Sequence, residues 1–240
     1  MDIISLISYS KFRGQIMTQT EYKIYIDDII RRVESARLNV GDHHIVKTVA
    51  VSKYSTSEEI KALYNIGQRA FGENKVQDLK QKSQELDHLP LEWHFIGNLQ
   101  KNKINNLLNI NPTLFHALDS LELAQELQKK LLAKNMSLDC LIQINSAKED
   151  SKHGFMPEVA IEVYNKIERE CPNIQLKGVM SIGAHSEDKA VVKKSFDTTY
   201  TIFKQLPNAT ICSMGMSGDF ELAIECGANM IRLGSLMFNK

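Results

Sequence analysis

The apolar positions of the chain first follow a helical period and then fall into short runs. From residue 20 to 38 they recur at helical spacing, at Tyr22, Ile26, Ile29, Ile30 and Val33, which predicts an opening helix. After that helix, short apolar and β-branched runs alternate with amphipathic helical segments. These runs predict eight strands, at residues 47–53, 69–73, 93–97, 114–118, 139–145, 176–182, 210–215 and 229–234.

Helix signals stand between these strands. Ser55 with Glu58, and Asp119 with Glu122, fit capping boxes, and Pro157 suits a first helical turn. Eight strand-then-helix units with no spare strand favour a closed parallel (β/α)8 barrel with an extra N-terminal helix. A doubly wound open sheet is the alternative, since a miscounted strand would change the topology.

The barrel is expected to span residues 17–240 as one domain, because no low-complexity or Pro/Gly/Ser-rich linker divides the chain. Residues 1–16 are expected to be an N-terminal extension, with Met17 as a candidate natural start; they lack the features of a signal peptide. The longest irregular connection, residues 145–155, follows the fifth strand and should lie over the functional face.

The composition excludes some partners. Of 240 residues, 29 are Lys or Arg and 29 are Asp or Glu, so no overall positive field favours nucleic acid or an anionic membrane. No apolar run is long enough to span a bilayer. The four cysteines are far apart and form no C-x-x-C pair, which indicates reduced packing residues of a cytoplasmic protein. No His, Cys or Asp spacing predicts a metal site.

Polar side chains converge at the carboxyl ends of the predicted strands, where barrels place their functional face. Lys53 ends the run "TVAVSK", and partial desolvation there would lower its pKa and make it a Schiff-base candidate. The segments "SMGMSGD" (213–219) and "RLGSL" (232–236) supply small residues, hydroxyls and backbone N–H groups after strands seven and eight, where barrels often bind phosphate.

Each of these features also has a plainer interpretation. Lys53 alone fits a solvated lysine at a strand end, and the two loops fit ordinary glycine turns. His94 either faces the ligand or packs inside the barrel, and packing is the commoner role of a single histidine in an apolar strand. The residues alone leave these alternatives open.

Several motifs in their order along the chain closely resemble the pyridoxal phosphate homeostasis protein family. They are "VAVSK", "FGENKVQD", "WHFIGNLQKNK", "ALDS", "KHGF", "GVMSI", "SMGMSGDFELAI" and "IRLGSLMF", and the resemblance covers about residues 45–238. Two rim positions depart from the family pattern, Gly183 where a proline is usual and Asn239 where a terminal glycine is usual.

The resemblance implies a fold-type III barrel, similar to the N-terminal domain of alanine racemase, that carries pyridoxal 5′-phosphate (PLP) as a Schiff base on Lys53. It implies that the phosphate is bound at Ser213, Gly215, Gly234 and Ser235. It also implies that Arg232 lies beside the ring or phosphate, and that Asn74 and His94 line the pocket.

A carrier of PLP is the expected function, with cofactor buffering, delivery to PLP-dependent apoenzymes and an indirect effect on amino-acid and keto-acid balance. An arginine beside the ring nitrogen would make the cofactor a poor electron sink, and the chain has no counterpart of the racemase C-terminal domain that supplies a second acid or base. No catalytic residue is therefore predicted, and a monomer is expected. The alternatives are a PLP-dependent racemase of low activity and a sugar-phosphate enzyme without PLP.

Overall fold

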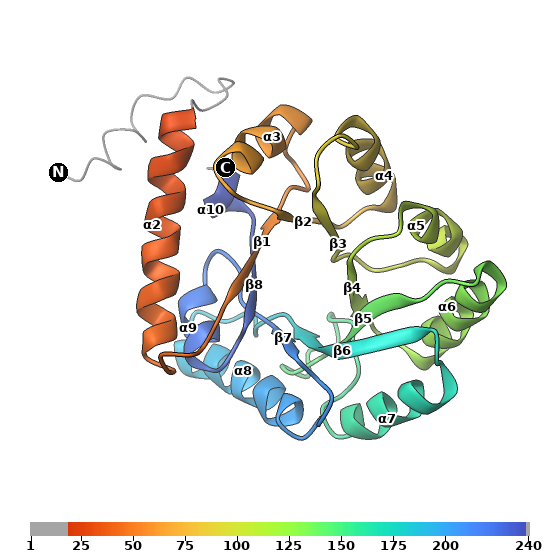
Figure 1. The fold of residues 1–240 in the computed structure, drawn as a ribbon. Coiled ribbons are helices and arrows are strands. Elements are labelled where there is room, and N and C mark those ends of the chain that lie inside the picture. The colour runs from red at the N-terminus through yellow and green to blue at the C-terminus, as the bar shows by residue number, and fades with distance from the viewer. Residues whose placement is uncertain (1–18, 239–240) are drawn as a thin grey trace.

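The computed structural model describes residues 19–238, and these form a closed barrel of eight parallel strands (Figure 1). The strands are β1 (Lys47–Val51), β2 (Ala70–Glu73), β3 (Glu92–Phe95), β4 (Leu114–Leu118), β5 (Leu138–Ile144), β6 (Ile174–Ser181), β7 (Ile211–Ser213) and β8 (Met230–Leu233). Each pairs with the next, and β1 also pairs with β8. All eight predicted strands are confirmed, and this closure excludes a doubly wound open sheet.

The helices surround the barrel on its outside (Figure 1). They are α2 (Gln19–Leu38), α3 (Ser57–Asn65), α4 (Val76–Glu85), the 3-10 turn η1 (Lys101–Lys103), α5 (Ile104–Ile110), α6 (Leu121–Lys134), α7 (Ala160–Glu170), α8 (Lys189–Phe203), α9 (Phe220–Glu225) and α10 (Ser235–Phe238). The predicted opening helix is confirmed as α2, which packs outside the barrel against α9, α3 and α10. Residues 1–16, predicted to be an extension, lie outside the described residues.

The strands form because their side chains are apolar on both faces, as expected of a parallel sheet between a filled interior and a layer of helices. All five residues of β4 are buried, and Phe115 stacks on Phe95 of β3 with ring centroids 5.7 Å apart. Gly178 lets β6 approach β7, since a Cβ there would lie 2.0 Å from the Ile211 carbonyl oxygen and the φ angle is +143°. The core is therefore continuous from the barrel interior to the helices.

Both predicted capping boxes are wrong by one residue. Thr56, rather than Ser55, caps α3 and forms a capping box with Glu59. Ser120, rather than Asp119, caps α6 through the Leu123 N–H. Each cap follows a neighbour that is itself a good N-cap residue, and the backbone conformation decides between them. The helical turn predicted at Pro157 is also wrong, because α7 begins at Ala160.

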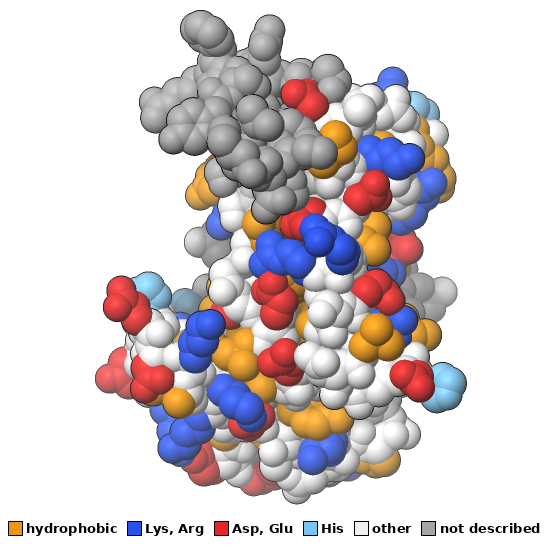
Figure 2. All heavy atoms as spheres, turned by 90° about the vertical axis from the view of Figure 1, so that its left-hand side faces the viewer, with side chains coloured by type: hydrophobic (Ala, Val, Ile, Leu, Met, Phe, Trp, Pro, Cys, Tyr) orange, Lys and Arg blue, Asp and Glu red, His pale blue; other side chains and the backbone are white. Residues whose placement is uncertain are grey.

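The surface on the α2 side carries acidic and basic side chains interspersed with one another (Figure 2). This distribution agrees with the equal numbers of acidic and basic residues in the sequence. Within residues 19–238, no helix combines the length and apolar character that a membrane span requires.

Candidate functional site

A cavity of about 500 Å³ opens where the carboxyl ends of β1 and β8 meet the loop after β7. It is called the Lys53 cavity below. Four of the predicted site residues line it: Lys53, Arg232, Gly234 and Ser235. The other lining residues are Val51, Tyr54, Ser55, Ile96, Met216, Ser217, Gly218 and Phe238. The structure therefore joins the predicted lysine to the two predicted phosphate loops.

Lys53 follows β1 by two residues, and its side chain is exposed at the cavity opening. Its Nζ lies 5.1 Å from the centroid of the Tyr54 ring, so the ammonium rests over an aromatic face. The protein by itself does not bury this amine. The desolvation expected from the sequence would have to come from a molecule that fills the cavity.

A buried ion pair fixes the backbone directly before Lys53. Lys82 of α4 donates from Nζ to Glu73 Oε1 and to the Ser52 carbonyl oxygen, both at 2.7 Å. The Ser52 hydroxyl donates to the same Glu73 oxygen at 2.6 Å. Glu73 is fully buried and Lys82 nearly so. Because this network holds Ser52 through its carbonyl and its hydroxyl, the end of β1 has one fixed position.

The loops after β7 and β8 are joined through one hydroxyl. Ser217 Oγ accepts hydrogen bonds from the N–H groups of Gly234 at 3.2 Å and Leu236 at 3.4 Å. The Met216 N–H donates to Asp219 Oδ1 at 2.6 Å, which closes the first loop. A Cβ on Gly218 would meet no atom within 4 Å. The loops thus combine N–H groups, hydroxyls and free space, which suits an anionic oxygen cluster.

Arg232 reaches the cavity from β8 but is itself buried. It donates from Nη1 to Ser213 Oγ at 2.7 Å and from Nη2 to the Ser181 carbonyl oxygen at 2.8 Å. Burial lowers its pKa to about 10, and the nearby Asp219 carboxylate opposes that shift. Arg232 therefore stays charged at neutral pH, with two of its N–H groups fixed by the protein.

Three predicted residues lie close to the cavity without lining it. Ser213 is fully buried beneath Arg232 and accepts its hydrogen bond. Gly215 packs against the first turn of α9, with a φ of +95°. Asn74 follows β2, and its carbonyl oxygen abuts Gly97, where a Cβ would lie only 2.0 Å away. Ser213 thus supports the Arg232 side chain, Gly215 packs on the start of α9, and Asn74 packs on the backbone after β3.

The structure does not bring His94 to the Lys53 cavity. Its side chain is 1% exposed and faces a smaller cavity of about 340 Å³ that also includes Lys47 and Asn229, residues at the start of β1 and β8. Its Nδ1 lies 2.9 Å from Nε2 of His116 on β4. The packing interpretation fits this position, because a residue near the middle of a strand points into a layer of the barrel interior.

This burial predicts an acid-sensitive stability. Desolvation and the charge of Lys47 lower the pKa of His94 to about 4, whereas an unfolded histidine titrates near 6.5. Between those pH values only the unfolded state binds the proton at this site, so the contribution of His94 to stability is complete above pH ~6.5 and falls by about 3 kcal/mol as the pH approaches 4. Urea unfolding between pH 7 and 4 should show a shallower fall for His94→Gln.

The matched control is His88→Gln, because His88 is exposed. The free energy of unfolding of His88→Gln should depend on pH as that of the wild type does, because the carboxylates of the two proteins contribute equally. A His94→Gln profile that parallels the wild type over this range would contradict the prediction.

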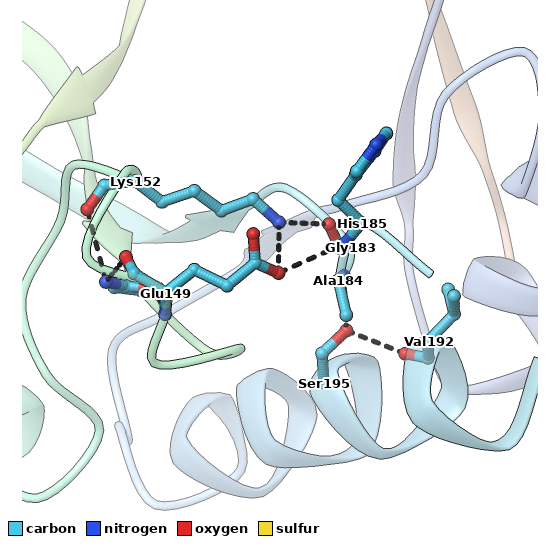
Figure 3. Close-up of polar contacts among 8 residues, drawn as sticks. Glu149, Lys152, Gly183, Ala184, His185, Val192 and Ser195 are labelled. Carbon is cyan, nitrogen blue, oxygen red and sulfur yellow. Dashed lines mark hydrogen bonds and ion pairs between the residues drawn. The ribbon is translucent and has the colours of Figure 1, made fainter. Parts of the chain in front are cut away.

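The connection after β5 is bonded to the loop after β6, as Figure 3 shows. Lys152 Nζ donates to the Gly183 carbonyl oxygen at 2.7 Å and pairs with Glu149 at 2.9 Å. The same Glu149 oxygen accepts the His185 N–H at 3.0 Å. The predicted long irregular connection after β5 is confirmed. Its Lys152 and Glu149 side chains join it to the loop after β6.

A second cavity, of about 780 Å³, adjoins the first beside this connection. It lies between residues 182–189 and α9, and it shares Met216 and Gly218 with the Lys53 cavity. A molecule bound near Lys53 therefore has open space on the side of the loops after β6 and β7.

Sequence reasoning missed three residues that matter to this geometry: Lys82, His116 and Ser217. Lys82 stands on the polar face of a helix, and the signal that points to it is Glu73, a carboxylate in an apolar strand that requires a partner. Ser217 is visible in the sequence only as part of its loop.

Among residues 19–238, no group of three or more His, Cys, Asp or Glu side chains is placed to hold a metal ion.

The Lys53 cavity is lined by a lysine amine, a buried arginine and two loops that carry N–H groups and hydroxyls. Its volume lies within the usual range for small-ligand sites, about 300–1,000 Å³. An amine suits an aldehyde, and loop N–H groups with hydroxyls suit a phosphate. The residues present therefore fit a ligand that carries both groups, as PLP does.

Comparison with known proteins places this chain among barrels of the alanine racemase N-terminal type. The family described as alanine racemase, N-terminal domain, matches residues 24–239. The alanine racemase of Clostridium difficile 630 in complex with cycloserine superposes with a TM-score of 0.70 over 88% of this chain and 59% of its own; at 16% identity this likeness shows the fold alone.

Nearer relatives narrow the class. The pyridoxal phosphate homeostasis protein of Helicobacter pylori strain J99 is 53% identical over 220 residues, which cover 92% of this chain and 99% of that protein. PipY of Synechococcus elongatus PCC7942, solved with PLP bound, is 31% identical with a TM-score of 0.75, covering 87% of this chain and 98% of its own. This chain belongs to the pyridoxal phosphate homeostasis protein family.

Proposed function

We propose that this protein binds PLP as a Schiff base on Lys53 and acts in PLP homeostasis as a carrier that buffers and delivers the cofactor. The observation that carries the proposal is the convergence of Lys53, Arg232 and the Gly234–Ser235 turn on one cavity. The PLP-bound PipY structure and the names of the relatives support the same ligand.

Each group has a part in holding the cofactor. The Lys53 amine attacks the aldehyde, and water leaves when the carbon–nitrogen double bond forms. The candidate donors to the phosphate are two backbone N–H groups, of Gly234 and Leu236, and two hydroxyls, of Ser217 and Ser235. In the structure both N–H groups donate to Ser217 Oγ. Arg232 supplies a fixed positive charge at the cavity wall.

The openness of the cavity favours a carrier over an enzyme. Lys53 and Ser235 are both exposed to solvent, whereas enzymes that stabilise reactive intermediates generally exclude water from them. Release of the cofactor requires water or a free amine to attack the imine carbon, and a linkage at the exposed cavity opening permits this. A racemase of low activity remains the alternative function, and it makes a separate prediction about turnover.

Absorption spectroscopy with mass spectrometry tests the proposal. Protein incubated with PLP should gain an absorption band near the visible edge, and the band should shift when borohydride reduces the Schiff base. Peptide mapping of the reduced protein should locate the added mass on Lys53. A protein that stays colourless after incubation, or an adduct confined to other lysines, would reject the proposal.

Proton exchange separates the carrier from the racemase. A carrier should exchange the α-proton of amino acids in deuterated water far more slowly than ordinary enzyme turnover, whose median is about 10 s⁻¹. Exchange at enzyme rates that depends on Lys53 would establish the racemase instead.

The partners and location complete the proposal. PLP-dependent apoenzymes are the acceptors we propose, and the second cavity beside Met216 provides space next to the cofactor. The cysteines at 140, 171, 212 and 226 are buried free thiols, which suits the reducing cytoplasm. We propose a monomer, which sedimentation of the PLP-loaded protein would test.

A further inference from the structure

A chain of buried polar groups runs through the barrel interior from the Lys53 cavity to the opposite opening. It begins at Arg232, whose Nη1 donates to Ser213 Oγ at 2.7 Å. Ser213 Oγ lies 3.2 Å from Nδ1 of His116, and Nε2 of His116 lies 2.9 Å from Nδ1 of His94. All four residues are at most 5% exposed. We call these four residues the interior chain.

The arginine sets the direction of this chain. A guanidinium only donates hydrogen bonds, so Ser213 accepts from Arg232. The one hydroxyl proton of Ser213 then has Nδ1 of His116 as its acceptor. With Nδ1 unprotonated, neutral His116 carries its proton on Nε2 and donates it to Nδ1 of His94. Burial lowers the pKa of His116 well below its ordinary value, in keeping with a neutral ring.

The far end of the chain supports the same direction. His94 then carries its proton on Nε2, which lies 3.9 Å from Glu92 Oε2 and has no hydrogen-bond partner among the described residues. Lys47 pairs with the same carboxylate. The opposite direction would turn a bare lone pair of His94 toward the Glu92 carboxylate and leave the Ser213 proton without this acceptor. Both effects are unfavourable in a buried site.

We propose that His116 and His94 are positioning residues for Arg232: through the Ser213 hydroxyl they hold the guanidinium in one place, so that its remaining N–H groups face the cofactor. This inference rests on the proposed function. Ser213 and the Ser181 carbonyl oxygen each take one N–H group of Arg232. If the hydroxyl turned, the first of these contacts would weaken, and the arginine would meet the cofactor in several orientations.

Substitution of His116 tests the proposal. His116→Phe removes the acceptor for Ser213 and should weaken PLP binding by at least about tenfold, the usual effect of losing a hydrogen bond that orients a charged group. It should also move the pH midpoint of the cofactor's absorption band. His116→Asn retains an amide oxygen near the Nδ1 position and should restore both values toward the wild type. His88→Phe, at an exposed site, is the matched control.

Nitrogen NMR of the wild-type protein provides a second readout that needs no variant. His116 and His94 should both carry their proton on Nε2 and leave Nδ1 unprotonated. A proton on Nδ1 of His116 would overturn the inference, even if His116→Phe fails to fold.

The outcomes separate this inference from the function on which it rests. If the wild type forms the Lys53 adduct while His116→Phe keeps wild-type affinity and spectrum, the interior chain does not position Arg232. If the wild type forms no adduct at all, the proposed function fails, and the NMR result alone decides the direction of the chain.

Discussion

Replacing Lys53 with alanine is expected to abolish the borohydride-trapped PLP adduct and the absorption band of the bound cofactor. The covalent link requires a primary amine, and Lys53 supplies the amine among the residues that line the cavity. The phosphate contacts remain in this variant, so weak non-covalent binding should persist. Mass spectrometry of the reduced protein, compared with its spectrum before reduction, measures the loss directly.

Two further variants show whether the loss is specific. Lys53→Arg keeps the positive charge but cannot form the Schiff base at neutral pH, so it should also lack the adduct. Lys80→Ala removes an exposed lysine of α4 and should retain it in full. An undiminished adduct in Lys53→Ala, mapped to another lysine, would contradict the prediction.

Replacing Lys82 with methionine is expected to destabilise the protein by about 3–5 kcal/mol, because it leaves Glu73 as a buried carboxylate without its cation. The Ser52 carbonyl oxygen also loses its lysine donor. Since Ser52 directly precedes Lys53, the variant that still folds should bind PLP more weakly than the wild type. Urea unfolding at neutral pH measures the first effect, and titration with PLP measures the second.

Lys80→Met is the matched control, because Lys80 is exposed on the same helix and should change stability by less than about 0.5 kcal/mol. Adding Glu73→Leu to Lys82→Met should recover much of the loss, since the double variant has no uncompensated charge. A Lys82→Met protein as stable as the control would show that the ion pair does not hold the end of β1.

The fold could be predicted because burial controls the pattern of a parallel barrel. Strands covered on both faces become apolar runs, such as β4 and β5, and these are visible without any tertiary information. The ends of elements were less predictable. Ser55 and Thr56 are both good N-cap residues, with serine the better one in isolation, and the backbone conformation of the folded chain selects Thr56.

The sequence predicts which end of the barrel carries the candidate site, but not how deep each side chain lies in the barrel interior. A polar residue near the carboxyl end of a strand is expected at the carboxyl-end face of the barrel. Lys53 and Arg232 both line one cavity there. The position in the strand does not reveal which layer of the interior a side chain fills, and Ser213 and His94 lie in deeper layers. Pairings such as Lys82 with Glu73 depend on how a helix docks on the strands, and a single sequence carries only the unpaired carboxylate as a sign of it.

Closure of the barrel between β1 and β8 has a consequence during protein synthesis. The Lys53 amine is translated long before the Gly234–Ser235 turn that lines the same cavity. A nascent chain that has not yet reached β7 and β8 therefore exposes the lysine without the loops that complete its cavity. If the proposed function holds, retention of the cofactor should report that β8 has docked against β1.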